Sequence, residues 1–128
     1  MKTIWYVDDD KEMVKAVALM LQLLDYETKP FYDARIAARA LLSGKNPDLI
    51  ILDINMPKVS GIEFLSFVRK QIRWHSIPIL MLSSEANDVQ VDEAMDLGAD
   101  GYVTKPVMID ELERAIDRAI AHRIGKIS

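Results

Sequence analysis

The chain has 128 residues, of which 50% are hydrophobic and 28% are charged, a composition typical of one globular domain rather than a disordered or fibrous chain. Its net charge of -4 and its pI near 5.1 argue against a broad surface for nucleic acid. The absence of cysteine excludes disulfides, thiolate nucleophiles and zinc-thiolate sites. The longest apolar stretch, Ala16 to Leu24, is far shorter than the ~20 residues of a membrane helix. We therefore expect a cytoplasmic protein that binds neither nucleic acid nor membrane directly.

Short β-rich runs alternate along the chain with segments of helical period, which predicts βα units and a mainly parallel sheet. Asp10 and Asp33 are placed to cap the first two helices, and Gly98 to end the fourth. Pro30 cannot donate to a ladder, so the second strand belongs at a sheet edge. In chain order we expect strand Thr3–Val7, a helix from Asp10 through Leu24, strand Glu27–Phe31, a helix from Asp33 to near Gly44, strand Asp48–Asp53, helix Ile62–Arg73, strand Ile79–Ser83, a helix from about Asp88 to Gly98, strand Gly101–Thr104, and a last helix over about 108–124 whose apolar stripe continues to Ile127.

Charged residues stand where three of these strands stop. Asp8 and Asp9 follow the first strand, Asp53 ends the third, and Lys105 follows the fifth. Because the carboxyl ends of parallel strands lie side by side, we expect these residues to converge on one cleft. Each close pair of carboxylates would cost about 3 to 4 kcal/mol at an effective dielectric of ~20, so a cation is needed there. Oxygen ligands without histidine or cysteine suit Mg²⁺, or Mn²⁺ in its place.

A carboxylate beside Mg²⁺ and a lysine is well placed to accept a phosphoryl group, because this transfer depends on positioning and charge neutralisation. Asp53 is the candidate nucleophile, since it alone ends the central strand. Pro57 restricts φ in the following loop, and Gly61 is able to take a positive φ. Ser83 ends the neighbouring strand with a hydroxyl that could donate to a phosphoryl oxygen.

The segments VDDD, LDINMP, PILMLSS and GADGYVTKP resemble, in this order and at these separations, the CheY-like receiver domain of two-component response regulators. The resemblance covers essentially the whole chain, as one domain over residues 1–128. It implies an α/β fold of the flavodoxin-like, doubly wound (βα)5 type, with strand order 2-1-3-4-5. It also implies a signalling phosphoacceptor that takes its phosphoryl group from a histidine kinase or a phosphotransfer protein. Such a domain catalyses only its own phosphorylation and dephosphorylation.

The resemblance assigns a role to each member of the charged cluster. By it, Asp53 is the phosphoacceptor, and Asp9 and Asp53 bind Mg²⁺ through their carboxylates. Asp8 supports the metal, largely through water, and Asn55 offers it a backbone carbonyl. Lys105 contacts the phosphoryl group. The kinase, the downstream protein or effector domain, and the oligomeric state stay open.

Further positions match those that the family uses for switching and for phosphoryl lifetime. Ser83 and Tyr102 match the hydroxyl and aromatic positions that reshape the face of the fourth helix, fifth strand and fifth helix on phosphorylation. The bond before Pro106 is often cis in the family. Asn55 and Glu85 resemble the pair found in chemotaxis-type receivers, which lose phosphate quickly, so a short-lived phosphoryl state is our hypothesis.

Some positions depart from the family pattern, and others have a purely structural interpretation. Gly101 and Ala115 stand where many receivers that dimerise through this face carry an acid and an arginine, so that dimer is not expected. Trp74 falls in an expected loop and has no partner that the sequence identifies. The basic residues near the end of the third helix are interpreted as one solvated face; they are Arg69, Lys70 and Arg73.

Two other functions compete with a phosphorylated receiver. A binding module that ignores phosphate is the alternative, although such a relative would be expected to lack Asp53, Lys105 or the acidic pair. A haloacid-dehalogenase-like phosphatase is suggested by Asp8 and Asp10, which form a D-x-D after the first strand. That family usually continues with Thr or Val where this chain has Glu12, and its substrate-capping insertions are absent, which disfavours it.

Overall fold

A computed structural model of the chain describes residues 1–84 and 88–127. Within these residues, parallel strands form a five-stranded sheet in the order β2-β1-β3-β4-β5, the predicted order. The strands are β1 (Thr3–Val7), β2 (Glu27–Phe31), β3 (Leu49–Asp53), β4 (Ile79–Ser84) and β5 (Gly101–Lys105). The helices are α1 (Lys11–Leu23), α2 (Ala34–Leu42), α3 (Gly61–Arg69), α4 (Asp88–Leu97) and α5 (Ile109–Ile127), with a 3-10 turn η1 (Ile72–Trp74).

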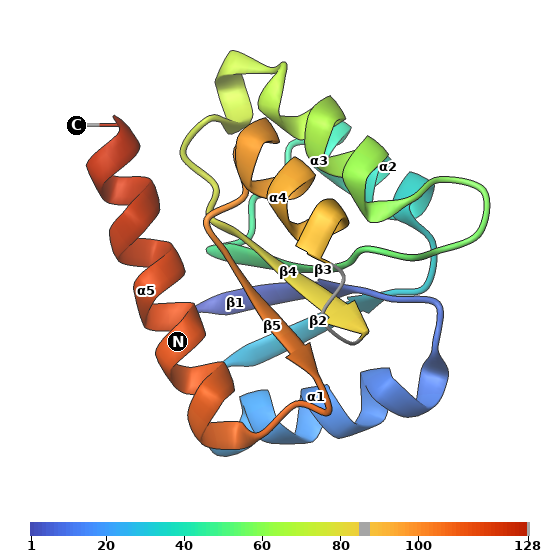
Figure 1. The fold of residues 1–128 in the computed structure, drawn as a ribbon, viewed down its shortest axis with the longest axis vertical. Coiled ribbons are helices and arrows are strands. Elements are labelled where there is room, and N and C mark those ends of the chain that lie inside the picture. The colour runs from blue at the N-terminus through green and yellow to red at the C-terminus, as the bar shows by residue number, and fades with distance from the viewer. Residues whose placement is uncertain (85–87, 128) are drawn as a thin grey trace.

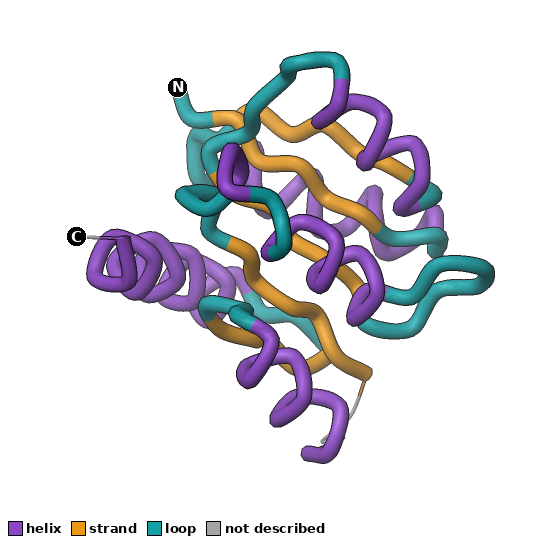
Figure 2. Tube along the Cα trace, turned by 90° about the horizontal axis from the view of Figure 1, so that it is seen from above, coloured by secondary structure: helices purple, strands orange, loops and turns teal. Residues whose placement is uncertain are grey.

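The sheet is the middle layer of three (Figure 1). Helices α2, α3 and α4 cover one face, and α1 and α5 cover the other, an arrangement that is also seen from above in Figure 2. Successive strand residues enter opposite cores: Trp5 and Val7 pack on the α2–α3–α4 side, whereas Ile4 and Tyr6 pack on the α1–α5 side. Strand β3 is buried along its whole length, as expected of a central strand covered on both faces. None of the described helices is long and apolar enough to cross a membrane.

Local signals in the sequence fix several element ends as predicted. Strand β2, which contains Pro30, lies at the edge of the sheet. The Asp10 carboxylate accepts hydrogen bonds from two backbone N–H groups of the first turn of α1, and Asp33 accepts one from the first turn of α2. At the end of α4, Gly98 has a φ of 110°, a left-handed conformation that glycine adopts without strain.

The third helix ends earlier than predicted. Helix α3 stops at Arg69, and the chain then forms η1 rather than continuing to Arg73. Trp74 explains the break: it is only 2% exposed, and its ring centroid lies 5.5 Å from that of Phe67. In a continued helix Trp74 would lie well away from the buried face that carries Val68, six residues earlier. The turn brings Trp74 into the core and gives it, in Phe67, a packing partner that the sequence did not identify.

The last helix begins at Ile109 and extends beyond residue 124 to Ile127, along the apolar stripe that the sequence carries to that residue. Its buried face consists of Leu112, Ile116, Ala119 and Arg123. The isoleucine stripe leaves the core near the end of the helix, where Ile124 is 58% exposed and Ile127 is 42% exposed. The reason is that the core position at the end of this face is occupied by Arg123, which reaches a buried carboxylate.

That carboxylate belongs to Asp100, the residue immediately before β5, and its side chain is fully buried. One oxygen accepts from Arg69 Nη2 at 2.8 Å, and the other accepts from Arg123 Nε at 2.9 Å and lies 2.7 Å from His122 Nδ1. The Gly98 carbonyl accepts from both arginines at 2.8 Å. We call Asp100 and the side chains of Arg69, His122 and Arg123 the Asp100 cluster. Its presence shows that the predicted solvated basic face was wrong for Arg69, whose side chain is 9% exposed.

Candidate functional site

The carboxyl ends of β1, β3 and β5 gather the acids and the lysine that the sequence singled out. In the β1–β3 ladder, Val7 pairs with Leu52, so both strands end at the same edge of the sheet. In the β3–β4 ladder, Asp53 pairs with Leu82 near the end of β4. Carboxylate oxygens of Asp8, Asp9 and Asp53 lie within 4.8 Å of one another. The predicted convergence of the three acids is therefore a feature of the fold.

Lys105 reaches this acidic group from the end of β5. Its Nζ lies 3.2 Å from Asp53 Oδ1 and 3.9 Å from Asp8 Oδ2. The Lys105–Pro106 bond is cis, as predicted. The lysine side chain is 22% exposed and that of Asp53 is 6% exposed, so the pair is largely shielded from water. The ammonium thus offsets part of the negative charge on the two buried carboxylates.

Asp8 is held by a residue that the sequence analysis did not identify. Tyr6 donates its hydroxyl to Asp8 Oδ2 at 2.5 Å, and the Asp10 N–H donates to Asp8 Oδ1 at 3.0 Å. Burial and the nearby Asp8 charge raise the pKa of Tyr6 far above its usual value, so the phenol stays protonated and remains a donor. A signal was present: residues two apart on a strand face the same side, which places Tyr6 beside Asp8.

Asp53 titrates abnormally in this setting. Burial, the charge of Asp8 and, to a smaller extent, the charge of Asp9 raise its pKa, and the net value is about 6. Lys105 lowers the pKa through its charge and hydrogen bond, but burial and the neighbouring acids outweigh it. A bound cation would favour the ionised carboxylate. The donor set is purely carboxylate oxygen, and its excess negative charge is incompletely offset by one lysine, so these residues fit a hard divalent cation such as Mg²⁺.

The loop after Asp53 passes unusually close to it. A Cβ atom on Gly61 would lie 2.1 Å from the Asp53 carbonyl oxygen, and the Gly61 N–H donates to the Ile54 carbonyl at 2.9 Å. Glycine is required here for close backbone approach, and not for the positive φ that the sequence suggested. The positive φ in this loop, 69°, belongs to Lys58. The result is a tight connection that brings the start of α3 against the end of β3.

The other residues that the sequence predicted for the site lie outside this group of three acids and one lysine. Ser83 is buried near the end of β4, one residue beyond the partner of Asp53 in the ladder. Asn55 is exposed, and its side-chain oxygen accepts a hydrogen bond from Gln90 on α4 at 3.2 Å. Tyr102 is 52% exposed on β5. Glu85 lies outside the described residues.

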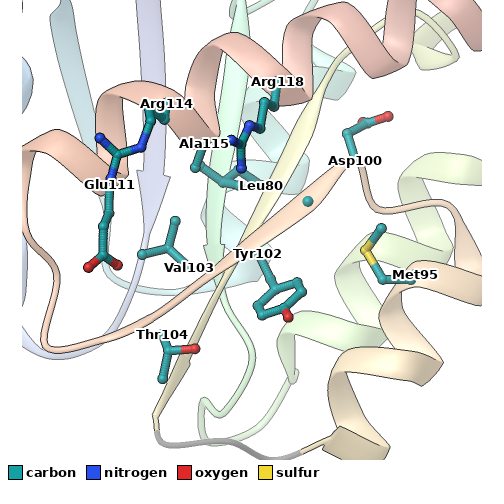
Figure 3. Close-up of a pocket in the computed structure, with 11 residues that line it drawn as sticks. Leu80, Met95, Asp100, Tyr102, Val103, Thr104, Glu111, Arg114, Ala115 and Arg118 are labelled. Carbon is teal, nitrogen blue, oxygen red and sulfur yellow. The ribbon is translucent and has the colours of Figure 1, made fainter.

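Tyr102 borders a cavity of about 440 Å³ on the α4–β5–α5 face (Figure 3). Leu80 lines it together with Met95 of α4, and two arginines of α5, Arg114 and Arg118, stand beside it. A Cβ atom on Gly101 would meet Leu80 Cδ1 at an ordinary 3.4 Å, so packing does not require glycine there. Gly101 itself lines the cavity.

Replacing Tyr6 with phenylalanine is expected to lower the free energy of unfolding by about 1 to 3 kcal/mol in metal-free buffer, because one oxygen of buried Asp8 then loses its hydrogen-bond donor. Urea denaturation of both proteins measures this difference. Tyr32→Phe, at a 45% exposed position, is the control and should change the midpoint little. Equal midpoints for Tyr6→Phe and the wild type would contradict the assigned hydrogen bond.

Comparisons of the sequence and of the structure with known proteins agree with the fold and the site described above. The family model of the response regulator receiver domain matches residues 4–117. The chain is 38% identical over 100 residues to the regulatory protein VanRc of Enterococcus gallinarum, covering 78% of this chain and 42% of that protein. It is 33% identical over 112 residues to the chemotaxis protein CheY of Pseudomonas aeruginosa, covering 88% of this chain and 90% of that protein.

A solved structure of the Vibrio cholerae chemotaxis protein CheY4 superposes with a TM-score of 0.83 at 34% identity, covering 93% of this chain and 98% of that one. The chain spans only 42 to 53% of the length of several relatives that it matches, including VanRc and transcriptional regulators. The family match, the fold and the carboxylates at the strand ends all support the same family assignment. The chain belongs to the response regulator receiver domain family, whose members are signalling phosphoacceptors of two-component systems.

Proposed function

We propose that Asp53 accepts a phosphoryl group from a histidine kinase or a phosphotransfer protein. The observation that carries this proposal is the meeting of Asp8, Asp9 and Asp53 within 4.8 Å, with Lys105 Nζ 3.2 Å from an Asp53 oxygen. In the transfer, an Asp53 oxygen attacks phosphorus, the new O–P bond forms, and the N–P bond to the donor histidine breaks. The histidine nitrogen keeps the electron pair of the broken bond.

The residues around Asp53 would have different roles in this reaction. Asp8, Asp9 and the Asp53 carboxylate would hold Mg²⁺, with the Asn55 backbone carbonyl as a further ligand; the ion supplies positive charge for the phosphoryl oxygens. Lys105 adds a second positive charge on the same carboxylate. Tyr6 and the Asp10 N–H orient Asp8. Ser83 would donate its hydroxyl to a phosphoryl oxygen. The same residues would serve the loss of phosphate to water, so the chain catalyses its own phosphorylation and dephosphorylation.

The structure gives no support to a phosphatase of the haloacid dehalogenase type. There the second acid of the D-x-D would have to serve the reaction, whereas the Asp10 carboxylate is engaged by the Glu12 and Met13 N–H groups at 3.0 and 3.3 Å. Asp10 is the cap of α1. The two acids of the pair thus have separate tasks, Asp8 at the strand end and Asp10 at the helix start.

We propose that the α4–β5–α5 face carries the output. Tyr102 is 52% exposed there, so a change of its rotamer towards the protein would alter both the cavity of Figure 3 and the surface beside it. Arg114 and Arg118, one helical turn apart on α5, favour a partner surface with carboxylates. The recipient would be a separate downstream protein or an effector domain.

Incubation with acetyl phosphate and Mg²⁺, followed by intact-protein mass measurement, tests the proposal. We expect one phosphoryl group per wild-type chain and none in the presence of EDTA. Lys105→Ala should be labelled roughly 10-fold to 100-fold more slowly, because it loses a cation that stabilises the transferring group. Lys70→Ala, at an exposed position on the end of α3, is the matched control and should behave as the wild type. Labelling that is indifferent to EDTA and to Lys105 would contradict the proposed site, and a wild type that forms no adduct at all would favour a module that ignores phosphate.

A further inference from the structure

The Lys105 ammonium lies beside two buried carboxylates but is bonded to only one of them. Its Nζ is 3.2 Å from Asp53 Oδ1 and 3.9 Å from Asp8 Oδ2, so only Asp53 is within hydrogen-bond distance. The Asp8 side chain is fully buried, and that of Asp53 is 6% exposed. Because burial removes most of the water that would solvate them, the two carboxylates compete for the Lys105 ammonium.

The alternation of side chains along the strands directs these groups to one side of the sheet. The residues two positions before the two acids and the lysine all pack in the core on the α1–α5 side; they are Tyr6, Ile51 and Val103. Side chains two apart on a strand point to the same face. Asp8 follows β1 directly, and its N–H continues the strand pairing by donating to the Phe31 carbonyl at 2.9 Å. Tyr6 therefore reaches Asp8 along one face of the sheet.

Tyr6 occupies the oxygen of Asp8 that faces the lysine. The Tyr6 hydroxyl donates to Asp8 Oδ2 at 2.5 Å, and the other oxygen, Oδ1, accepts from the Asp10 N–H at 3.0 Å. Oδ2 is also the oxygen that lies 3.9 Å from Lys105 Nζ. Both oxygens of Asp8 thus have a neutral donor, and neither requires the ammonium. The positive charge of Lys105 is left to Asp53.

We propose that Tyr6 is a positioning residue: by holding Asp8 Oδ2 it keeps Lys105 on Asp53 and so speeds phosphoryl transfer to Asp53. The inference rests on the proposed function and adds a residue to that same site. With acetyl phosphate as the donor, an Asp53 oxygen bonds to phosphorus while the bond from phosphorus to the acetyl oxygen breaks. Acetate leaves with the electron pair of the broken bond, and no proton is transferred.

Loss of the Tyr6 hydroxyl would redirect the lysine. Asp8 Oδ2 would then have no other hydrogen-bond donor among the described residues, which is unfavourable for a buried carboxylate. A shift of about 1 Å would bring Lys105 Nζ into hydrogen-bond distance of that oxygen and draw it away from Asp53. We expect Tyr6→Phe to be phosphorylated about threefold to tenfold more slowly, the effect of one hydrogen bond of ordinary strength. The loss is smaller than that expected for Lys105→Ala, because the ammonium is displaced and not removed.

A double-mutant cycle separates this role from a general effect on the site. Initial labelling rates of the wild type, Tyr6→Phe, Lys105→Ala and the double variant are measured by intact mass with acetyl phosphate. Mg²⁺ is saturating for each protein, so that a change in metal affinity does not account for a difference in rate. We expect Tyr6→Phe to slow labelling of the wild type and to have no additional effect in the Lys105→Ala background. Tyr26→Phe is the control, because Tyr26 directly precedes β2 at the amino end of the strands, away from Asp53; it should be labelled as the wild type.

A second measurement needs no phosphorylation. In crystal structures without metal, we expect Lys105 Nζ to lie nearer to Asp8 Oδ2 in Tyr6→Phe and nearer to Asp53 Oδ1 in the wild type. A water molecule in place of the hydroxyl, with Lys105 unmoved, would overturn the inference and leave the proposed function intact. Equal labelling rates of the wild type and Tyr6→Phe, or the same slowing by Tyr6→Phe in both backgrounds, would do the same. Failure of the wild type to form any adduct would overturn both.

Discussion

Replacement of Asp100 by alanine is expected to lower the free energy of unfolding by about 3 to 5 kcal/mol, the cost of leaving buried charges without their partner. The Asp100 side chain is fully buried, and those of Arg69 and Arg123 are 9% and 5% exposed. Burial and the charge of Arg123 already lower the pKa of Arg69 to about 10, and Asp100 opposes that shift. Without Asp100, two guanidinium groups would repel each other in a site with little water, and the N–H of Ile79 would lose its acceptor.

Urea denaturation at neutral pH measures this loss, and the chain provides a matched control. Arg35 and Asp33 also form an ion pair, 2.6 Å long, but the arginine side chain is 48% exposed. Arg35→Ala should therefore cost only about 0 to 1 kcal/mol. Asp100→Asn retains the size of the side chain and should still be clearly destabilising, since the charge is lost. Asp100 variants as stable as Arg35→Ala would contradict the role of Asp100 as the partner that compensates the two buried arginines.

Replacement of Asp53 by asparagine is expected to stabilise the metal-free protein by about 2 to 3 kcal/mol above pH 7, because it removes a charge that burial and Asp8 disfavour. The carboxyl group titrates near pH 6 in the folded protein and near 3.8 in the unfolded chain. Between these values the folded state binds more protons than the unfolded state. The unfolding free energy of the wild type therefore decreases as pH rises through this window, as far as this group is concerned.

The pH dependence distinguishes this effect from a change in packing. The advantage of Asp53→Asn should be fully present above the folded pKa of about 6 and should disappear as pH falls towards 4. Urea midpoints for both proteins at several pH values, in EDTA, measure the difference. Added Mg²⁺ should stabilise the wild type more than the variant, since the ion binds the ionised carboxylate. A difference that stays constant between pH 4 and pH 7 would contradict the elevated pKa.

The parts of the molecule that were predictable from sequence depend on local patterns. Pro30 placed β2 at an edge because proline lacks an N–H, and Asp10 and Asp33 marked helix starts because their carboxylates accept from the first turn. The gathering of Asp8, Asp53 and Lys105 followed from one rule, that parallel strands end at a common edge.

The parts that were missed depend on contacts between distant segments. Arg69 was interpreted as solvated because its partner Asp100 lies 31 residues away and no periodicity connects them. The requirement for glycine at 61 comes from the carbonyl of Asp53, eight residues earlier, and becomes visible only when the loop is folded back. Tyr6 was different: its position two residues before Asp8 was a signal that strand geometry could have supplied.

The measurement that tests the central claim most directly is the location of the phosphoryl group. Wild-type protein labelled with acetyl phosphate and Mg²⁺ would be digested at low pH, and the peptides compared by mass with those of unlabelled protein. We predict that the group lies on Asp53, and that labelled Asp53→Asn yields no modified peptide. A phosphoryl group on Asp8, Asp9 or any other residue, or labelling of Asp53→Asn to the wild-type extent, would contradict the assignment of Asp53 as the phosphoacceptor.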